Sequence, residues 1–252
     1  MKKKGVRTPC TRRRGQELLQ KSGRLNLQGI LFDFGDTIGY IDHDENRRYE
    51  RALLSIVRRY GHRKSLGELS SSLGKAYWKS NKGEMRDFQE FWEIFLKDLG
   101  VPKSPAVIKS LQQHRIGHYS TIFKLYEGTI SVLTILRRKY RLALVSNCAV
   151  GLSDVLQTLD LERFFECIVL SYEIGVRKPD RRLYFKALQG LKLEPNECIF
   201  VADEISDLEG AREVGLKTLL VRQGPHTTHE AKDLNFKPDF ECNSISEITR
   251  FL

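Results

Sequence analysis

A chain of 252 residues with 40% apolar and 29% charged side chains is typical of a soluble globular protein, with one core plus an insertion or two small domains. It has no apolar run long enough to span a bilayer and no apolar segment of a secretory signal, which argues against membrane insertion. The five cysteines form no CxxC pair and their number is odd, so we expect no disulfide framework and a reducing, cytoplasmic setting.

The formal charge of +10 is concentrated in the first 28 residues. Nine of the 42 Lys and Arg side chains, but only one of the 32 Asp and Glu side chains, fall in residues 1–28, which leaves 33 basic and 31 acidic side chains in residues 29–252. We expect residues 1–28 to form a basic, disordered tail. Alternatives are non-specific contact with nucleic acid or an anionic surface, a transit peptide, and a start codon placed too far upstream.

A short apolar run opens the patterned part of the chain. Residues Ile30 to Phe32 predict a buried strand that ends in a loop, and Asp33 comes directly after it. An unpaired carboxylate is costly to bury, so Asp33 requires a partner. Because ligands bind at the carboxyl ends of parallel strands, we expect Asp33 to face a site, with the Thr37 hydroxyl four residues further on.

Residues 43–120 carry helical periodicity. Apolar residues recur at helical spacing over 49–60, after residue 65, over 88–99 and after residue 104. Ser65 and Glu68 have the spacing of a capping box, and Ser104-Pro105 has the pattern of a helix start. Four helices with one apolar face each predict a small bundle, whose core is the aromatic stripe of residues 88–99.

After Gly128 the pattern becomes an alternation of helices and strands. Strands are expected at Arg141–Ser146, Cys167–Ser171, Cys198–Asp203 and Lys217–Arg222, with helices near 152–160, 180–190 and 205–215. This alternation predicts an α/β fold with a Rossmann-like parallel sheet covered on both faces. The strand near residue 30 belongs to the same sheet, so the domains are expected to be an α/β core of residues 29–42 and 121–252 and a helical insertion of residues 43–120.

Two segments after the insertion carry polar groups suited to anions. Ser146 and Asn147 end a strand just before a helix, where a hydroxyl and backbone N–H groups favour a phosphate. Lys178 precedes a proline that restricts it to an extended backbone and starts the next helix, which fixes the direction of the ammonium. Beside a carboxylate, this ammonium would keep the carboxylate ionised and neutralise the charge of a bound anion.

A pair of acids follows the next buried strand. Asp203 and Asp207 are four residues apart at the end of the run Ile199–Ala202. Mg²⁺ binds oxygen ligands, retains several waters and uses few protein carboxylates, so this pair predicts a magnesium site. Asp207 has the alternative role of a helix cap.

In this order and spacing, the segments resemble the four motifs of the haloacid dehalogenase-like hydrolases. The resemblance covers residues 29–252, and the helical insertion resembles the C1-type cap of that family. It implies a five-stranded sheet of order 5-4-1-2-3 and a Mg²⁺-dependent phosphatase or phosphotransferase acting on a small phosphorylated metabolite. It further implies that Asp33 is the nucleophile that forms an aspartyl-phosphate. Ser146, Asn147 and Lys178 would bind the substrate, and Lys178 and Ser146 would also assist catalysis. The implied metal ligands are Asp33, Gly35, Asp203 and Asp207.

Gly35 departs from the pattern of the family. Relatives carry a second Asp there, whose carbonyl binds Mg²⁺ and whose carboxyl handles protons, and glycine retains only the carbonyl. General acid–base catalysis typically contributes ~10²–10⁴-fold, so the chain could be slow or stop at the phospho-enzyme. The alternative is therefore a catalytically weak or inactive member that acts as a binding module. A haloacid dehalogenase is the less favoured reading, since the paired acids Asp203 and Asp207 are retained.

Overall fold

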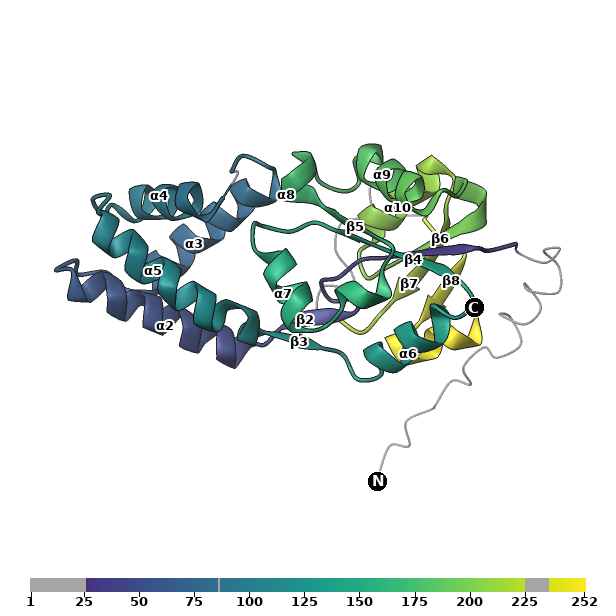
Figure 1. Ribbon diagram of the computed structural model, residues 1–252, viewed down its shortest axis with the longest axis horizontal. Helices are drawn as coiled ribbons and strands as arrows, with labels where there is room; N and C mark the ends of the chain where they lie inside the picture. The colour runs from purple at the N-terminus through teal and green to yellow at the C-terminus, as the bar shows by residue number, and fades with distance from the viewer. Residues whose placement is uncertain (1–25, 86, 225–235) are drawn as a thin grey trace, which may run out of the picture.

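The computed structural model describes residues 26–85, 87–224 and 236–252, so most of the expected basic tail lies outside the described residues. An α/β domain is built on one sheet, and a bundle of helices lies beside it (Figure 1). The described end of the tail segment already joins the sheet. Gln28 donates its backbone N–H to the carbonyl of Glu197 at 2.8 Å and accepts from the backbone N–H of Arg141 at 2.9 Å.

The main sheet is parallel and has the order β5-β4-β1-β6-β7-β8. Its strands are β1 (Gly29–Phe32), β4 (Arg141–Ser146), β5 (Cys167–Leu170), β6 (Cys198–Ala202), β7 (Lys217–Val221) and β8 (Phe240–Cys242). The five expected strands lie in the expected order. The expected strand count was wrong, because β8 extends the sheet beyond β7, and its three residues are too few to show a periodic pattern.

Helices cover both faces of this sheet, because alternate strand residues point to opposite sides. Ile30 and Phe32 belong to one apolar cluster together with residues of α6 (Thr129–Leu136) and α7 (Leu152–Thr158). Leu31 belongs to a second cluster with residues of α9 (Arg181–Leu191) and α10 (Ile205–Val214). The short helix α8 (Ser171–Ile174) and the 3-10 helices η2 (Glu162–Phe164), η3 (Pro195–Glu197) and η4 (Ile245–Arg250) complete this domain. The strand core is therefore buried on both sides, as the α/β alternation predicted.

The insertion is the expected four-helix bundle, formed by α2 (His43–Arg59), α3 (Leu66–Asn81), α4 (Phe88–Leu99) and α5 (Pro105–His118). The Ser65–Glu68 capping box is present at the start of α3. Phe91, Trp92 and Phe95 of α4 are buried, and the ring of Trp92 makes edge-to-face contacts with both phenylalanines at centroid distances of 5.1 and 5.6 Å. The aromatic stripe thus forms the core of the bundle.

A small antiparallel ribbon that the sequence pattern did not predict joins the two domains. It pairs β2 (Gly39–Ile41) with β3 (Phe123–Leu125), on either side of the insertion, and the 3-10 helix η1 (Tyr119–Ile122) leads into β3. The backbone N–H of Asp42 donates to the carbonyl of Ile122 at 2.8 Å, which brings the two crossing segments together at the bundle. Both connections between the domains therefore pass through one narrow element.

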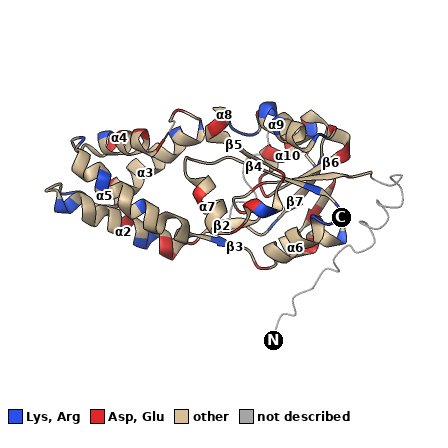
Figure 2. Ribbon diagram, viewed as in Figure 1, with Lys and Arg blue, Asp and Glu red and all other residues tan. Residues whose placement is uncertain are grey.

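Along the described ribbon of both domains, basic and acidic residues are interspersed (Figure 2). This distribution agrees with the near balance of acidic and basic residues after residue 28. None of the described helices is long and apolar enough to cross a membrane.

The aromatic core of the bundle provides a test of its contribution to stability. Phe95→Ala removes a side chain that is 0% exposed, so we expect it to lower the free energy of unfolding by about 3–5 kcal/mol. Phe185→Ala, at a side chain on α9 that is 48% exposed, is the matched control and should change it by less than about 1 kcal/mol. Urea unfolding followed by circular dichroism measures both; equal losses would contradict the assignment of Phe95 to the core.

Candidate active site

Three neighbouring strands bring the predicted polar residues to one edge of the sheet. Asp33 follows β1, Ser146 ends β4 and Asp203 follows β6, and β1 lies between the other two strands. The backbone N–H of Asp33 donates to the carbonyl of Val201 at 2.9 Å, so its position is fixed by the sheet. All three side chains are buried. The strand order therefore brings Asp33, Ser146 and Asp203 to neighbouring strand ends.

Lys178 lies at the centre of the site. Its ammonium Nζ is 2.8 Å from Asp33 Oδ1 and 2.7 Å from Asp207 Oδ2, and its side chain is fully buried. The Asn147 side chain holds the lysine backbone from both sides: its Oδ1 accepts from the N–H of Lys178 at 2.7 Å, and its Nδ2 donates to the carbonyl at 3.2 Å. Asn147, predicted to bind substrate, thus positions Lys178 through its side chain.

Thr37 holds Asp203 in a similar way. Its hydroxyl accepts from the backbone N–H of Asp203 at 3.0 Å and donates to Asp203 Oδ1 at 3.2 Å. Thr37 is completely buried, so water does not compete for these bonds. Thr37, four residues after Asp33, therefore joins the loop after β1 to the loop after β6.

Burial and mutual repulsion set the protonation of the acids. Burial raises the pKa of Asp33 to about 6, although the Lys178 charge opposes that rise. Burial, reinforced by the charges of Asp33 and Asp36, raises the pKa of Asp203 to about 8. Burial alone would lower the pKa of Lys178, but Asp207 and Asp33 raise it above its ordinary value, so the ammonium stays charged.

The oxygen atoms of this edge suit a hard divalent cation. Asp33 and Asp203 repel each other, and Asp207 Oδ1 is buried without a hydrogen-bond partner among the described residues. Nowhere in residues 26–85, 87–224 and 236–252 do three or more His, Cys, Asp or Glu side chains cluster as metal ligands. The donors available are thus the few carboxylates of Asp33, Asp203 and Asp207, which are oxygen ligands of the kind that Mg²⁺ binds together with waters.

Gly35 occupies an unstrained position. Its φ is outside the left-handed region, and a Cβ added there meets no other atom within 4 Å. The next residue, Asp36, has a φ of 52°, and its Oδ1 accepts from the Tyr126 hydroxyl at 3.3 Å. A carboxyl group could therefore be accommodated at residue 35, whereas the carboxyl of Asp36 is engaged by Tyr126.

A cavity of about 440 Å³ lies between this edge of the sheet and the bundle. The α/β domain contributes Gly35, Ser146 and Asn147 to its wall, and the bundle contributes residues such as Tyr77 and Asn81. Its volume is within the range of small-molecule sites. Sequence reasoning missed the bundle residues, because helical periodicity identifies an apolar face but does not tell which polar residue faces a neighbouring domain.

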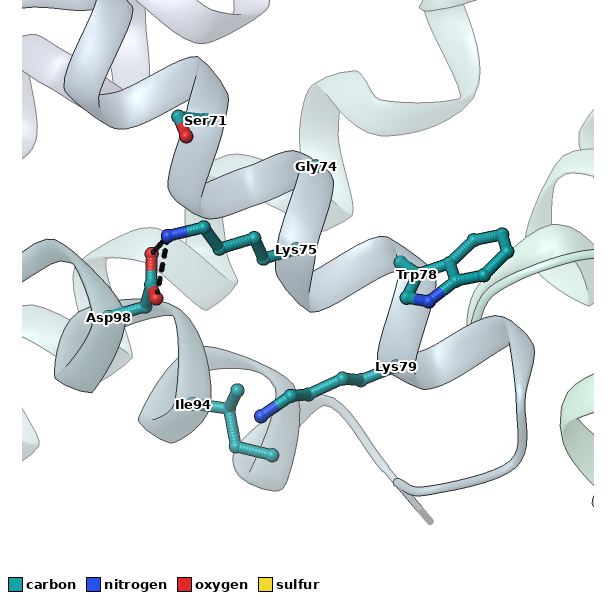
Figure 3. A pocket seen from close by; sticks show the side chains of 7 residues that line it. All are labelled: Ser71, Gly74, Lys75, Trp78, Lys79, Ile94 and Asp98. Atoms are coloured by element: carbon teal, nitrogen blue, oxygen red, sulfur yellow. Dashed lines mark hydrogen bonds and ion pairs between the residues drawn. The ribbon is translucent and has the colours of Figure 1, made fainter.

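A second hollow, of about 430 Å³, lies between α3 and α4 (Figure 3). Its wall includes Trp78, Lys79 and Ile94, and an ion pair of 3.1 Å between Lys75 and Asp98 bridges the two helices. It shares no lining residue with the cavity beside Gly35. The hollow is therefore a feature of the bundle surface and separate from the candidate active site.

Known proteins resemble this chain over most of its length. It is 27% identical over 233 residues to a glyceraldehyde 3-phosphate phosphatase of Methanopyrus kandleri, covering 88% of this chain and 95% of that protein. It is 26% identical over 216 residues to the haloacid dehalogenase-like hydrolase domain-containing protein 3 of Bos taurus, covering 79% and 83%.

Solved structures share the fold. A 2-haloacid dehalogenase from Pseudomonas syringae pv. Tomato DC3000 superposes with a TM-score of 0.69 at 18% identity, and a HAD phosphatase from Thermococcus onnurineus with a TM-score of 0.62 at 21% identity. Each match covers 89% of this chain and 97% of the other. A family model described as haloacid dehalogenase-like hydrolase matches residues 30–221. The chain therefore belongs to the haloacid dehalogenase-like hydrolases and is a hydrolase.

Proposed function

We propose that this hydrolase cleaves a small phosphomonoester through an aspartyl-phosphate on Asp33, with Mg²⁺ as cofactor. The observation that carries the proposal is the buried ion-paired group of Asp33, Lys178 and Asp207 beside a cavity of small-molecule size. Relatives named as glyceraldehyde 3-phosphate phosphatases support phosphomonoesters as the substrate class.

In the proposed reaction, a carboxylate oxygen of Asp33 attacks phosphorus and the bond from phosphorus to the alcohol oxygen breaks. The electron pair of that bond leaves with the alcohol oxygen, which takes a proton from solvent. Water then hydrolyses the aspartyl-phosphate to free phosphate and Asp33. Lys178 keeps Asp33 ionised and neutralises charge on the phosphoryl group, and the Ser146 hydroxyl donates to a phosphate oxygen. Positioning and charge neutralisation are thus the main contributions of these residues.

Asp33, Asp203, Asp207 and the Gly35 carbonyl would hold the Mg²⁺. When bound, the cation neutralises negative charge on the transferred group and on the crowded acids. The raised pKa of Asp203 supports this assignment, because a cation would relieve the repulsion that contributes to it.

Gly35 favours a second candidate, a weakly active or inactive member that retains binding. Residue 35 carries no carboxyl group, so it can neither donate a proton to the leaving alcohol nor accept one from the attacking water. A 2-haloacid should be turned over less readily than a phosphomonoester, because Asp203 and Asp207 are both retained. A screen of phosphomonoesters and 2-haloacids with and without Mg²⁺ separates these functions.

We expect Gly35→Asp to increase the turnover of an aryl phosphate, by up to ~10²–10⁴-fold where proton transfer to or from water limits the rate. A Cβ added at residue 35 meets no atom within 4 Å, and the φ of Gly35 is outside the left-handed region, so the backbone accepts a side chain there. Asp33→Asn should abolish turnover in both backgrounds, since it removes the nucleophile.

Gly35→Asn is the matched control, because it has the shape of Asp but cannot transfer the proton as a carboxyl does. It should leave turnover near that of the wild type, with folding of each variant checked by circular dichroism. Equal gains from Asp and Asn would contradict a proton-transfer role for this position. High wild-type turnover that Gly35→Asp does not change would mean that another group already transfers the proton.

The pKa of Asp203 predicts how stability depends on pH and metal. In the metal-free protein, the unfolded chain loses a proton above about pH 4 that folded Asp203 retains up to about pH 8, so the free energy of unfolding should fall as the pH rises between these values. Mg²⁺ binds ionised carboxylates, so millimolar Mg²⁺ should raise the melting temperature more at pH 8 than at pH 5. Differential scanning fluorimetry with EDTA or Mg²⁺ measures both effects.

Asp203→Asn should flatten the pH dependence and remove most of the response to Mg²⁺. Asp180→Asn is the control: hydrogen bonds from Arg182 lower the pKa of Asp180 to about 2, so the contribution of this residue is constant from pH 5 to pH 8. A Mg²⁺ response that is the same in the wild type and in Asp203→Asn would contradict the metal assignment.

A further inference from the structure

The cavity between the two domains has a wall rich in aromatic rings. Phe34 and Tyr40 come from the segment after β1, Tyr77 from α3, and Tyr119 and Phe123 from the segment that returns to the sheet. None of the described residues in this wall is a lysine or arginine. Aromatic walls favour planar rings by stacking and edge-to-face contact, and the absence of cations there disfavours a second anionic group.

Asn81 provides an unused hydrogen-bond acceptor in the same wall. Its Oδ1 is buried and has no partner among the described residues, whereas its backbone carbonyl accepts from the Ser171 hydroxyl at 3.0 Å. A buried acceptor without a donor is costly, so turning the Asn81 amide toward a ligand with an N–H or O–H group would satisfy it. The side chain is not needed for the bond to Ser171, which makes it a separable feature of the cavity.

Gly35 limits which alcohols can leave. Without a carboxyl at residue 35, the leaving oxygen departs with its negative charge unless another group supplies a proton. An alkyl alcohol resembles water, whose pKa is about 16. A phenol has a pKa of about 10, so a phenolate can leave without a proton donor. The missing acid therefore disfavours alkyl phosphates far more than aryl phosphates.

We propose, resting on the phosphatase function above, that the substrate is an aryl phosphate whose uncharged ring fills the aromatic cavity and donates a hydrogen bond to Asn81. Asp33 attacks phosphorus and the bond between phosphorus and the phenolic oxygen breaks. The phenolate leaves with the electron pair and takes a proton from solvent. Water then hydrolyses the aspartyl-phosphate, which releases phosphate and regenerates Asp33.

The first test compares leaving groups through kcat/KM, which covers the steps up to phosphoryl transfer to Asp33. Phenyl phosphates with substituents that change the phenol pKa are compared with glycerol 3-phosphate and glyceraldehyde 3-phosphate. We expect the wild type to favour the aryl esters by about 10²–10⁴-fold and Gly35→Asp, but not Gly35→Asn, to narrow that gap. If the wild type cleaved alkyl esters with the same kcat/KM as aryl esters, the proposal would be overturned. Loss of that alkyl activity in His43→Ala would then identify the imidazole in the cavity wall as the proton donor.

The second test measures binding without turnover. Asp33→Asn protein is titrated by calorimetry with phenyl phosphate, with hydroxyphenyl phosphates substituted at each ring position, and with glycerol 3-phosphate. We expect the aryl esters to bind more tightly, and Asn81→Ala to weaken at least one hydroxyphenyl ester by about 2–10-fold without affecting phenyl phosphate. Asn243→Ala, at an exposed residue outside the cavity, is the control and should change none of these affinities.

The two tests separate this inference from the phosphatase function. The protein could bind aryl esters selectively, in a manner that depends on Asn81, and yet cleave no phosphomonoester. That result would support the aryl ligand and reject the phosphatase function. Turnover of phosphomonoesters with no preference for aryl esters, in kcat/KM or in binding, would retain the phosphatase and reject the aryl substrate.

Discussion

The Lys178 ammonium, 2.8 Å from Asp33 and 2.7 Å from Asp207, is buried with both of its partners. Transfer of each charge out of water costs several kcal/mol, and only close pairing offsets that cost; removing one partner of a buried pair typically costs about 3–5 kcal/mol. The loop after β1, the segment between α8 and α9, and the first turn of α10 must therefore fold together, since each supplies one of the three charges. Asn147 adds the loop after β4, because it holds the backbone of Lys178.

The helical insertion does not disturb this arrangement. The chain enters and exits the insertion through the ribbon of β2 and β3, beyond the end of β1. The loop that carries Asp33 and Thr37 can then pack against β6 while residues 43–118 form a bundle with its own aromatic core. The bundle closes one side of a cavity whose other side is the carboxyl edge of the sheet. The wall of this cavity is thus shared by the carboxyl edge of the sheet, the ribbon and the bundle.

Much of the fold could be predicted because strands buried on both faces are continuous apolar runs, and because Asp33, Ser146 and Asp203 each follow such a run. The order of these strands and the role of Lys178 came from the resemblance to a family, since periodicity alone does not order a sheet. Strands of three residues, such as β8 and the ribbon strands, show no period. Asn81 was missed for a different reason: an unused acceptor is recognised only when its surroundings are known.

Gly35 affects the charge of the site as well as its proton chemistry. Asp33, Asp203 and Asp207 place three carboxylates around one buried ammonium, and repulsion already contributes to the raised pKa of Asp203. A further carboxylate at residue 35 would add to that repulsion and make ionised Asp33 depend more strongly on a cation. Glycine removes this repulsion together with the proton carrier. In the proposed reaction, glycine at residue 35 therefore favours an ionised Asp33 and requires a leaving group that is stable as an anion.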